Sequence, residues 1–187
     1  MSGSPPVIER GVSGVAHGGG SGGWSRPGSR CRSGGGPPGC TAVSGSGGTT
    51  TTEDLAENGG MASVWGARAT NLPATGTVNY QMVGSTRPVA INGSGTPGTV
   101  NSAALAVNFG TMRAGFQASL THNGANVGIS STGGTAAPSM LITSEGAFSE
   151  FGTSHISGFL AGAGGTHAGV SYRGGGLNGV IAFGRTP

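Results

Sequence analysis

Residues Thr111-Met-Arg-Ala-Gly-Phe-Gln-Ala-Ser-Leu-Thr121 alternate between apolar and polar side chains, and this alternation decides the fold class. A period of two turns one set of side chains to one face of a strand: Met112, Ala114, Phe116, Ala118 and Leu120. The other face carries Arg113, Gln117, Ser119 and Thr121. Asn123-Gly124 follows, the pair that two-residue hairpins favour because both positions need a positive φ. The sequence therefore predicts a hairpin whose returning strand carries Val127 and Ile129.

Similar strand-like segments lie on both sides of this hairpin in the sequence. Further strands are expected at Thr77–Met82, Thr99–Phe109, Ser139–Ser144, Ala147–Phe151, Thr153–Gly162, His167–Arg173 and Leu177–Gly184. Eight or nine strands at intervals near ten residues favour an all-β meander, and no segment beyond Thr75 has helical periodicity. We predict an all-β protein, an eight-stranded antiparallel up-and-down β-barrel over residues 75–187.

Glycine, at 42 of 187 residues, is about three times its usual share and suits sharp corners. The predicted outward faces carry Asn79, Gln81, Arg113 and Gln117, where an outer-membrane barrel needs an apolar band. No apolar run reaches the roughly 18 residues of a membrane-spanning helix. We expect a water-soluble barrel without a transmembrane segment.

Residues 1–52 are low in complexity and rich in Gly, Ser and Pro, so we predict a disordered N-terminal segment. The sequence of residues 29–40 resembles the product of GC-rich DNA read in a wrong frame. We hypothesise that the N-terminal segment is mistranslated or serves as a tether. Cys31 and Cys40 either form a disulfide in an oxidising compartment or are themselves products of the mistranslation. Residues 53–74 are expected to be a linker with a short helical turn over 53–57. No secretory signal peptide is visible.

The net charge of +3 does not predict a nucleic-acid-binding protein. All nine basic residues are Arg, and four of them lie in residues 1–48, so no basic stripe interleaved with aromatic residues exists. We expect no nucleic-acid partner.

Catalytic residues are hard to find in this sequence. The sole Asp, Asp54, precedes the predicted barrel, so a Ser-His-Asp arrangement lacks its usual carboxylate. Three Gly-x-Gly-x-x-Gly matches lack the strand–helix context of a dinucleotide site. We expect no enzyme, no cofactor and no metal site. Two interpretations of His155 and His167 are possible: they are solvated turn residues, or one of them binds a metal or haem.

Two apolar loops are candidate partner-binding sites. One contains Arg87, Val89 and Ile91, and the other contains Pro138 and Met140. Apolar loop tips on a rigid scaffold bind protein partners. The alternative is that these residues cap the barrel mouths and close the core.

The C-terminal third carries Gly158-Phe-Leu-Ala-Gly-Ala163, His167-Ala-Gly169 and a final Val180-Ile-Ala-Phe-Gly-Arg185. These motifs, with Gly76-Thr-Val-Asn-Tyr80 upstream, resemble the β-barrel domain of transferrin-binding protein B and related bacterial surface lipoproteins. The resemblance implies a barrel of the cell envelope, at the cell surface or in the periplasm, that captures host proteins or iron and haem sources. The chain has no recognisable handle domain, and no binding residue carries over. The alternative is a structural or adhesive envelope module with no small ligand.

Overall fold

A computed structural model describes residues 7–9, 28–31, 40–46, 49–55, 63–66, 69–93 and 96–186. Every regular element in these ranges is a β-strand, which confirms the all-β prediction. The first five strands are Val7–Glu9 (β1), Gly28–Cys31 (β2), Cys40–Ser46 (β3), Thr49–Leu55 (β4) and Ser63–Trp65 (β5). The others are Thr77–Ser85 (β6), Val89–Ala90 (β7), Thr99–Asn108 (β8), Arg113–His122 (β9), Ala125–Ser130 (β10), Met140–Leu141 (β11), Ala147–Phe151 (β12), His155–Ala161 (β13), His167–Gly174 (β14) and Leu177–Arg185 (β15). Within the described ranges, no helix could span a bilayer.

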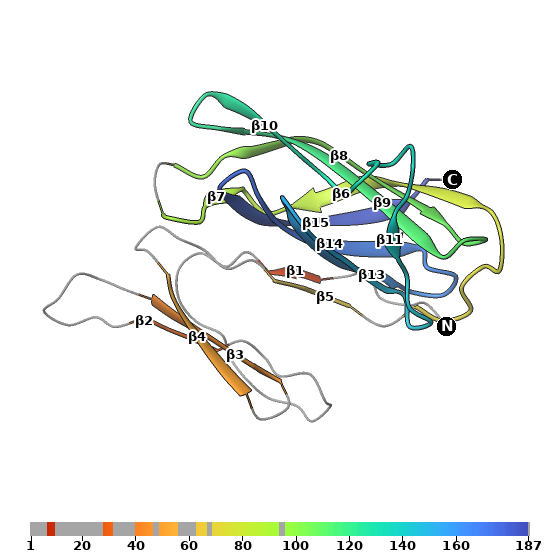
Figure 1. Cartoon of the computed structure of the whole chain (residues 1–187), viewed down its shortest axis with the longest axis horizontal. Helices are drawn as coiled ribbons and strands as arrows, with labels where there is room; N and C mark the ends of the chain where they lie inside the picture. The colour runs from red at the N-terminus through yellow and green to blue at the C-terminus, as the bar shows by residue number, and fades with distance from the viewer. Residues whose placement is uncertain are drawn as a thin grey trace, which may run out of the picture.

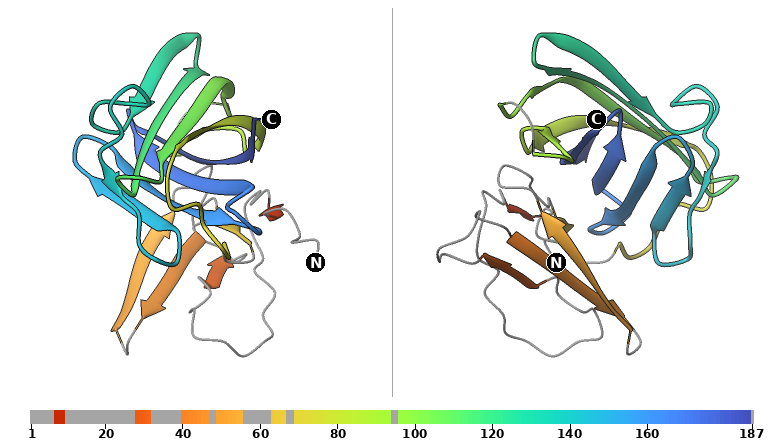
Figure 2. Two further views of the ribbon diagram at one scale, coloured as in Figure 1. Left: turned by 90° about the vertical axis from the view of Figure 1, so that its right-hand side faces the viewer. Right: turned by 60° about the vertical axis from the view of Figure 1, so that its left-hand side comes forward.

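Eight strands form the path of one curled sheet, in the order β10-β9-β8-β6-β15-β14-β13-β12 (Figure 1). All neighbours on this path are antiparallel. The last strand pairs back onto the first, for example at Arg185↔Tyr80. This is the order of an up-and-down meander, and the sheet curls into a half-barrel (Figure 2).

The prediction of a closed barrel is wrong, because β10 and β12 are not hydrogen-bonded neighbours. Residues 131–146 join them through turns and the two-residue β11, where we expected a full strand over Ser139–Ser144. β11 pairs with β9, and the segment reaches β12 through an isolated bridge, Ile142↔Phe148, and not through a ladder. Pro138 has no amide hydrogen to donate to a ladder. We call this opening between β10 and β12 the seam.

The strand–turn–strand prediction is confirmed over residues 113–129, whereas Thr111 and Met112 lie in the preceding turn, in which Met112 has a φ of 50°. Ala114, Phe116, Ala118 and Leu120 are all buried on the concave face of β9. Asn123 and Gly124 have φ of 49° and 76°, as the two-residue turn requires, and His122 pairs with Ala125. The periodicity of the sequence therefore fixed the face and register of this hairpin correctly.

The core fills the concave face of the half-barrel. Phe116 lies at its centre, with ring centroids 6.4 Å from Tyr172 and 6.2 Å from Phe183. The ring of Phe148 covers Gly158 on the neighbouring strand, where an added Cβ would come 2.4 Å from the ring. Glycine at position 158 therefore makes room for an aromatic side chain at the seam.

Part of the predicted linker over 53–74 packs against the sheet. Val64 of β5 lies over Gly169 of β14, where an added Cβ would come 2.6 Å from Val64 Cγ2. Ala69 donates its amide hydrogen to the Leu160 carbonyl, and Thr70 donates to Gly162. The packed unit thus begins before the expected boundary at residue 75.

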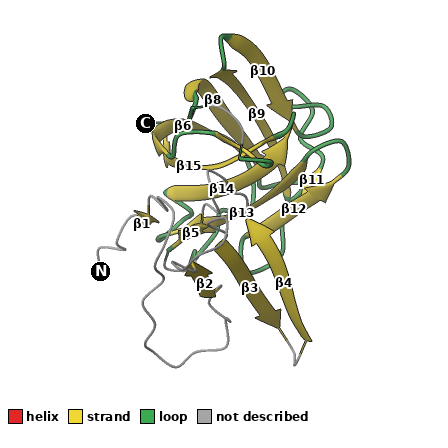
Figure 3. Ribbon diagram, turned by 90° about the vertical axis from the view of Figure 1, so that its left-hand side faces the viewer, coloured by secondary structure: helices red, strands yellow, loops and turns green. Residues whose placement is uncertain are grey.

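The low-complexity segment is described only in its strands. β2, β3 and β4 form a three-stranded antiparallel sheet (Figure 3), in which Cys31 stands opposite Cys40. β4 extends to Leu55, where we expected a helical turn. The other residues of 1–52 and residues 56–57 lie outside the described residues. Disorder, mistranslation and cysteine pairing therefore stay predictions.

Candidate functional site

The seam places two exposed apolar side chains close together on the convex face. Ile142 and Phe148 are buried, so alternation turns Leu141 and Phe151 outward. Leu141 is 64% exposed and Phe151 is 72% exposed. If the antiparallel register of the isolated Ile142↔Phe148 bridge is continued by one residue, Leu141 comes to the level of Ser149, two positions from Phe151.

Basic and aromatic neighbours flank this pair. Leu141 pairs with the exposed Arg113 of β9, whose Nη1 donates to the Ser139 carbonyl oxygen at 2.5 Å. Phe151 pairs with the exposed His155 of β13, and their rings meet edge to face at 5.2 Å. We call Arg113, Leu141, Phe151 and His155 the seam patch. It combines two apolar side chains with one fixed positive charge and an imidazole.

Glu150 ties the seam together from the concave side. Its Oε1 accepts from the amide of Thr132 at 2.7 Å and from the Thr132 hydroxyl at 2.9 Å. Its Oε2 lies 2.9 Å from Ser139 Oγ, whose single proton can also go to the Thr132 carbonyl at 2.7 Å. Partial burial would raise the pKa of Glu150, but these hydrogen bonds to the ionised form outweigh it and lower the pKa. We call this set of contacts the Glu150 clasp.

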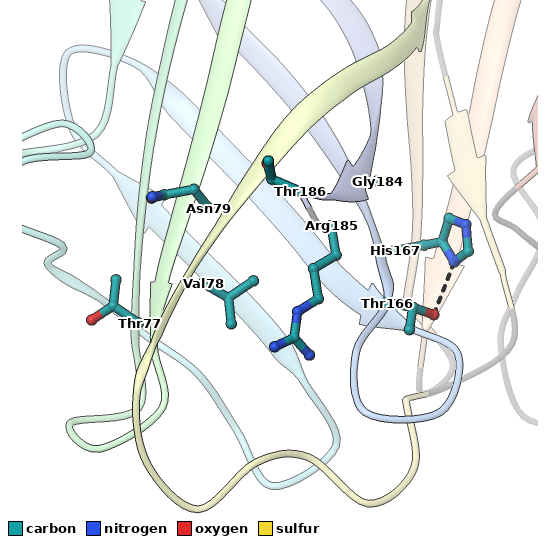
Figure 4. Close-up of a pocket in the computed structure, with 8 residues that line it drawn as sticks. All are labelled: Thr77, Val78, Asn79, Thr166, His167, Gly184, Arg185 and Thr186. Atoms are coloured by element: carbon teal, nitrogen blue, oxygen red, sulfur yellow. Dashed lines mark hydrogen bonds between the residues drawn. The ribbon is translucent and has the colours of Figure 1, made fainter.

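An open pocket of about 670 Å³ lies where β6, β14 and β15 meet (Figure 4). Arg185 extends on the side of Val78, whereas the His167 ring points away from it and contacts Thr166 Oγ1 through Nδ1 at 3.1 Å. Burial raises the pKa of the nearby Tyr80 to about 12, against a smaller lowering by Arg185. Since its two basic side chains do not converge, this pocket is a weaker candidate site than the seam patch.

The first predicted loop is held by its own contacts. Arg87 is exposed, but its Nη2 donates to the Pro97 carbonyl at 2.7 Å and its Nε to Gly98 at 3.3 Å. Val89 and Ile91 are half-buried, and the Ile91 amide donates to Gly176. This arrangement agrees with the alternative that the loop caps the mouth of the sheet.

In the second predicted loop, Met140 is not exposed as a partner-binding residue would be. Met140 is only 2% exposed and belongs to the core, because its position in β11 turns it to the concave face. Pro138 is half-buried. The exposed apolar residue of this segment is Leu141, one position later.

The two candidate ligand histidines do not meet. His155 pairs with Arg173 at one end of the β13–β14 hairpin, and His167 pairs with Ala161 at the other end. These pairs are six positions apart along the strand, about 20 Å. Among the described residues, no group of three or more His, Cys, Asp and Glu side chains could hold a metal ion.

Leu141, Phe151, Arg113 and Glu150 were not among the site residues that the sequence predicted. Alternation in Ala147–Phe151 could have assigned Phe148 and Phe151 to opposite faces, but not which face is covered. Comparison with protein-family models and with curated proteins finds no match for this chain.

Proposed function

We propose that this chain is a non-enzymatic binding module of the bacterial cell envelope that captures a protein partner through the seam patch. The observation that carries the proposal is the exposure of Leu141 and Phe151, two large apolar side chains on segments joined by the Ile142↔Phe148 bridge. Large exposed apolar side chains that adjoin one another are typical of interaction surfaces. The resemblance of residues 158–163 and 180–185 to transferrin-binding protein B barrels supports the envelope location.

The chemistry of the patch favours a partner with an apolar surface bordered by carboxylates. Arg113 supplies a permanent positive charge beside Leu141, and its contact with Ser139 limits its motion. The carboxylate of Glu150 faces the other side of β12 and is engaged with Thr132 and Ser139. The partner's acidic groups would therefore meet attraction on the convex face, and they would guide the encounter.

The test is capture by the immobilised full chain of candidate partners, namely host iron-carrier proteins and acidic envelope proteins, measured by surface plasmon resonance. A partner should bind saturably. Leu141→Ser and Phe151→Ser together should weaken it by at least about tenfold, because each buried apolar side chain contributes more than about 1 kcal/mol. Val83→Ser is the matched control, since Val83 is 67% exposed on β6, away from the seam.

The outcomes separate the remaining possibilities. Equal weakening by the control and the double variant would contradict a role for the seam patch. Saturable binding of haem with no protein captured would move the function to an iron or haem ligand. Surface adhesion without any saturable partner would favour the structural or adhesive module.

A further inference from the structure

The two edges of the seam are not equally protected. Residues 142–143 cover the first two residues of β12, through the Ile142↔Phe148 bridge and the Thr143 amide donating to Ala147, and the Glu150 clasp adds a charge farther along this strand. Inward charges and covering loops are the usual protection of edge strands. β10 pairs only with β9 among the described strands, at one margin of the sheet (Figure 1).

The hydrogen bonds of β10 fix which backbone groups are free. A two-residue turn closes on a pair that exchanges both hydrogen bonds, here His122 and Ala125. The odd residues of β10 therefore bond to β9, and the pattern continues to Ser131, whose amide donates to Phe116 at 2.9 Å. The amides and carbonyls of Asn126, Gly128 and Ser130 point away from the sheet.

β10 carries none of the features that blunt an edge. Its sequence, Ala-Asn-Val-Gly-Ile-Ser, has no charge and no proline, and its register with β9 runs without a bulge. An added Cβ at Gly128 would meet no atom within 4 Å, so the convex face at the middle of β10 is open and tolerates a small side chain. An incoming strand must be uncharged, with apolar residues on the concave side and small polar ones on the convex side.

β10 itself meets these requirements, and we propose that the chain forms a two-fold dimer by antiparallel pairing of β10 with β10 of a second copy, centred on Gly128. This register sets Val127 against Ile129 of the second copy on the concave side. Asn126 then faces Ser130 of the second copy on the convex side. No charges oppose each other across the axis. Because the pairing uses the same edge of both copies, it closes as a dimer and does not extend into a chain. It does not depend on the proposed partner.

The interface is small, so the dimer is weak and depends on concentration. The first experiment is sedimentation equilibrium of the full chain from about 10 μM to about 1 mM, a range that covers weak association. The wild type and Gly128→Ala should dimerise alike. Gly128→Pro should dimerise at least about tenfold more weakly, because it removes one outward donor from each copy while β9 loses none. Circular dichroism checks that the proline variant is folded.

If the proline variant does not fold, a cysteine cross-linking experiment tests the β10–β10 dimer. In a background with Cys31→Ser and Cys40→Ser, Gly128→Cys places two thiols on hydrogen-bonded partners with Cα atoms about 5.5 Å apart, within disulfide reach. Mild oxidation should yield a covalent dimer. Gln117→Cys, one strand away on the convex face, should not. A wild type that stays monomeric throughout, or equal cross-linking at positions 117 and 128, would overturn the proposal.

Discussion

The Glu150 clasp should contribute measurably to stability although it lies near the surface. Glu150→Ala removes two hydrogen bonds from Thr132 and one that Ser139 shares with a carbonyl. A partly solvated hydrogen bond to a carboxylate contributes about 0.5–1 kcal/mol. The expected loss in the free energy of unfolding is therefore about 1–2 kcal/mol. Glu150→Gln keeps the acceptor toward Thr132 and should lose about half as much.

The contribution depends on pH in a defined direction. The folded state lowers the pKa of Glu150 from its ordinary value of 4.5. Stabilisation by the ionised clasp is thus fully present above pH 4.5 and is lost as the pH falls through the folded-state pKa. The wild type and Glu150→Gln should differ at pH 7 and converge at acid pH.

The assay is urea denaturation of the full chain at pH 7 and near pH 3, followed by tryptophan fluorescence and circular dichroism. Glu145→Gln is the matched control, because Glu145 is exposed and does not belong to the Glu150 clasp. Glu150→Ala within 0.3 kcal/mol of wild type, a difference of about the additivity error, would refute the reasoning. So would a wild-type advantage over Glu150→Gln that persists unchanged at acid pH.

Three further predictions concern glycine and tyrosine residues. Gly158→Ala should destabilise the fold by about 1–3 kcal/mol through overpacking, whereas Gly128→Ala should lie within about 0.5 kcal/mol of wild type, both by urea denaturation. Tyr80→Phe loses a buried 2.6 Å hydrogen bond and should cost about 1 kcal/mol, but Tyr172→Phe should be neutral or stabilising because its buried hydroxyl has no hydrogen-bond partner among the described residues. Stability should fall as the pH rises from 10 toward 12, because burial raises the pKa of Tyr80 to about 12 and also raises the pKa of Tyr172, and Tyr80→Phe should reduce that fall in an alkaline denaturation series.

The local sequence pattern was sufficient to predict most strands and which face of the sheet their side chains occupy. The β9–β10 hairpin follows from alternation and from Asn123-Gly124, and Ala147–Phe151 is observed with the bounds that the sequence predicts. These features depend on period and on turn geometry, which neighbouring residues determine among themselves. The all-β class and the meander order were predictable for the same reason.

The seam and the site depended on contacts between distant residues. The sequence could not indicate that residues 131–146 would leave β10 and β12 unpaired, since closure requires a ladder between strands some 20 residues apart. The side chain of Glu150, 18 residues from Thr132, holds that segment instead. Met140 and Leu141 are equally apolar in sequence, but only the covering of one face of β11 buries the first and exposes the second. The sequence by itself determined the strands, their alternation and the tight turn, because these are local. Only the tertiary structure decided where the barrel stays open and which apolar residues remain in water, because packing across the whole sheet decides both.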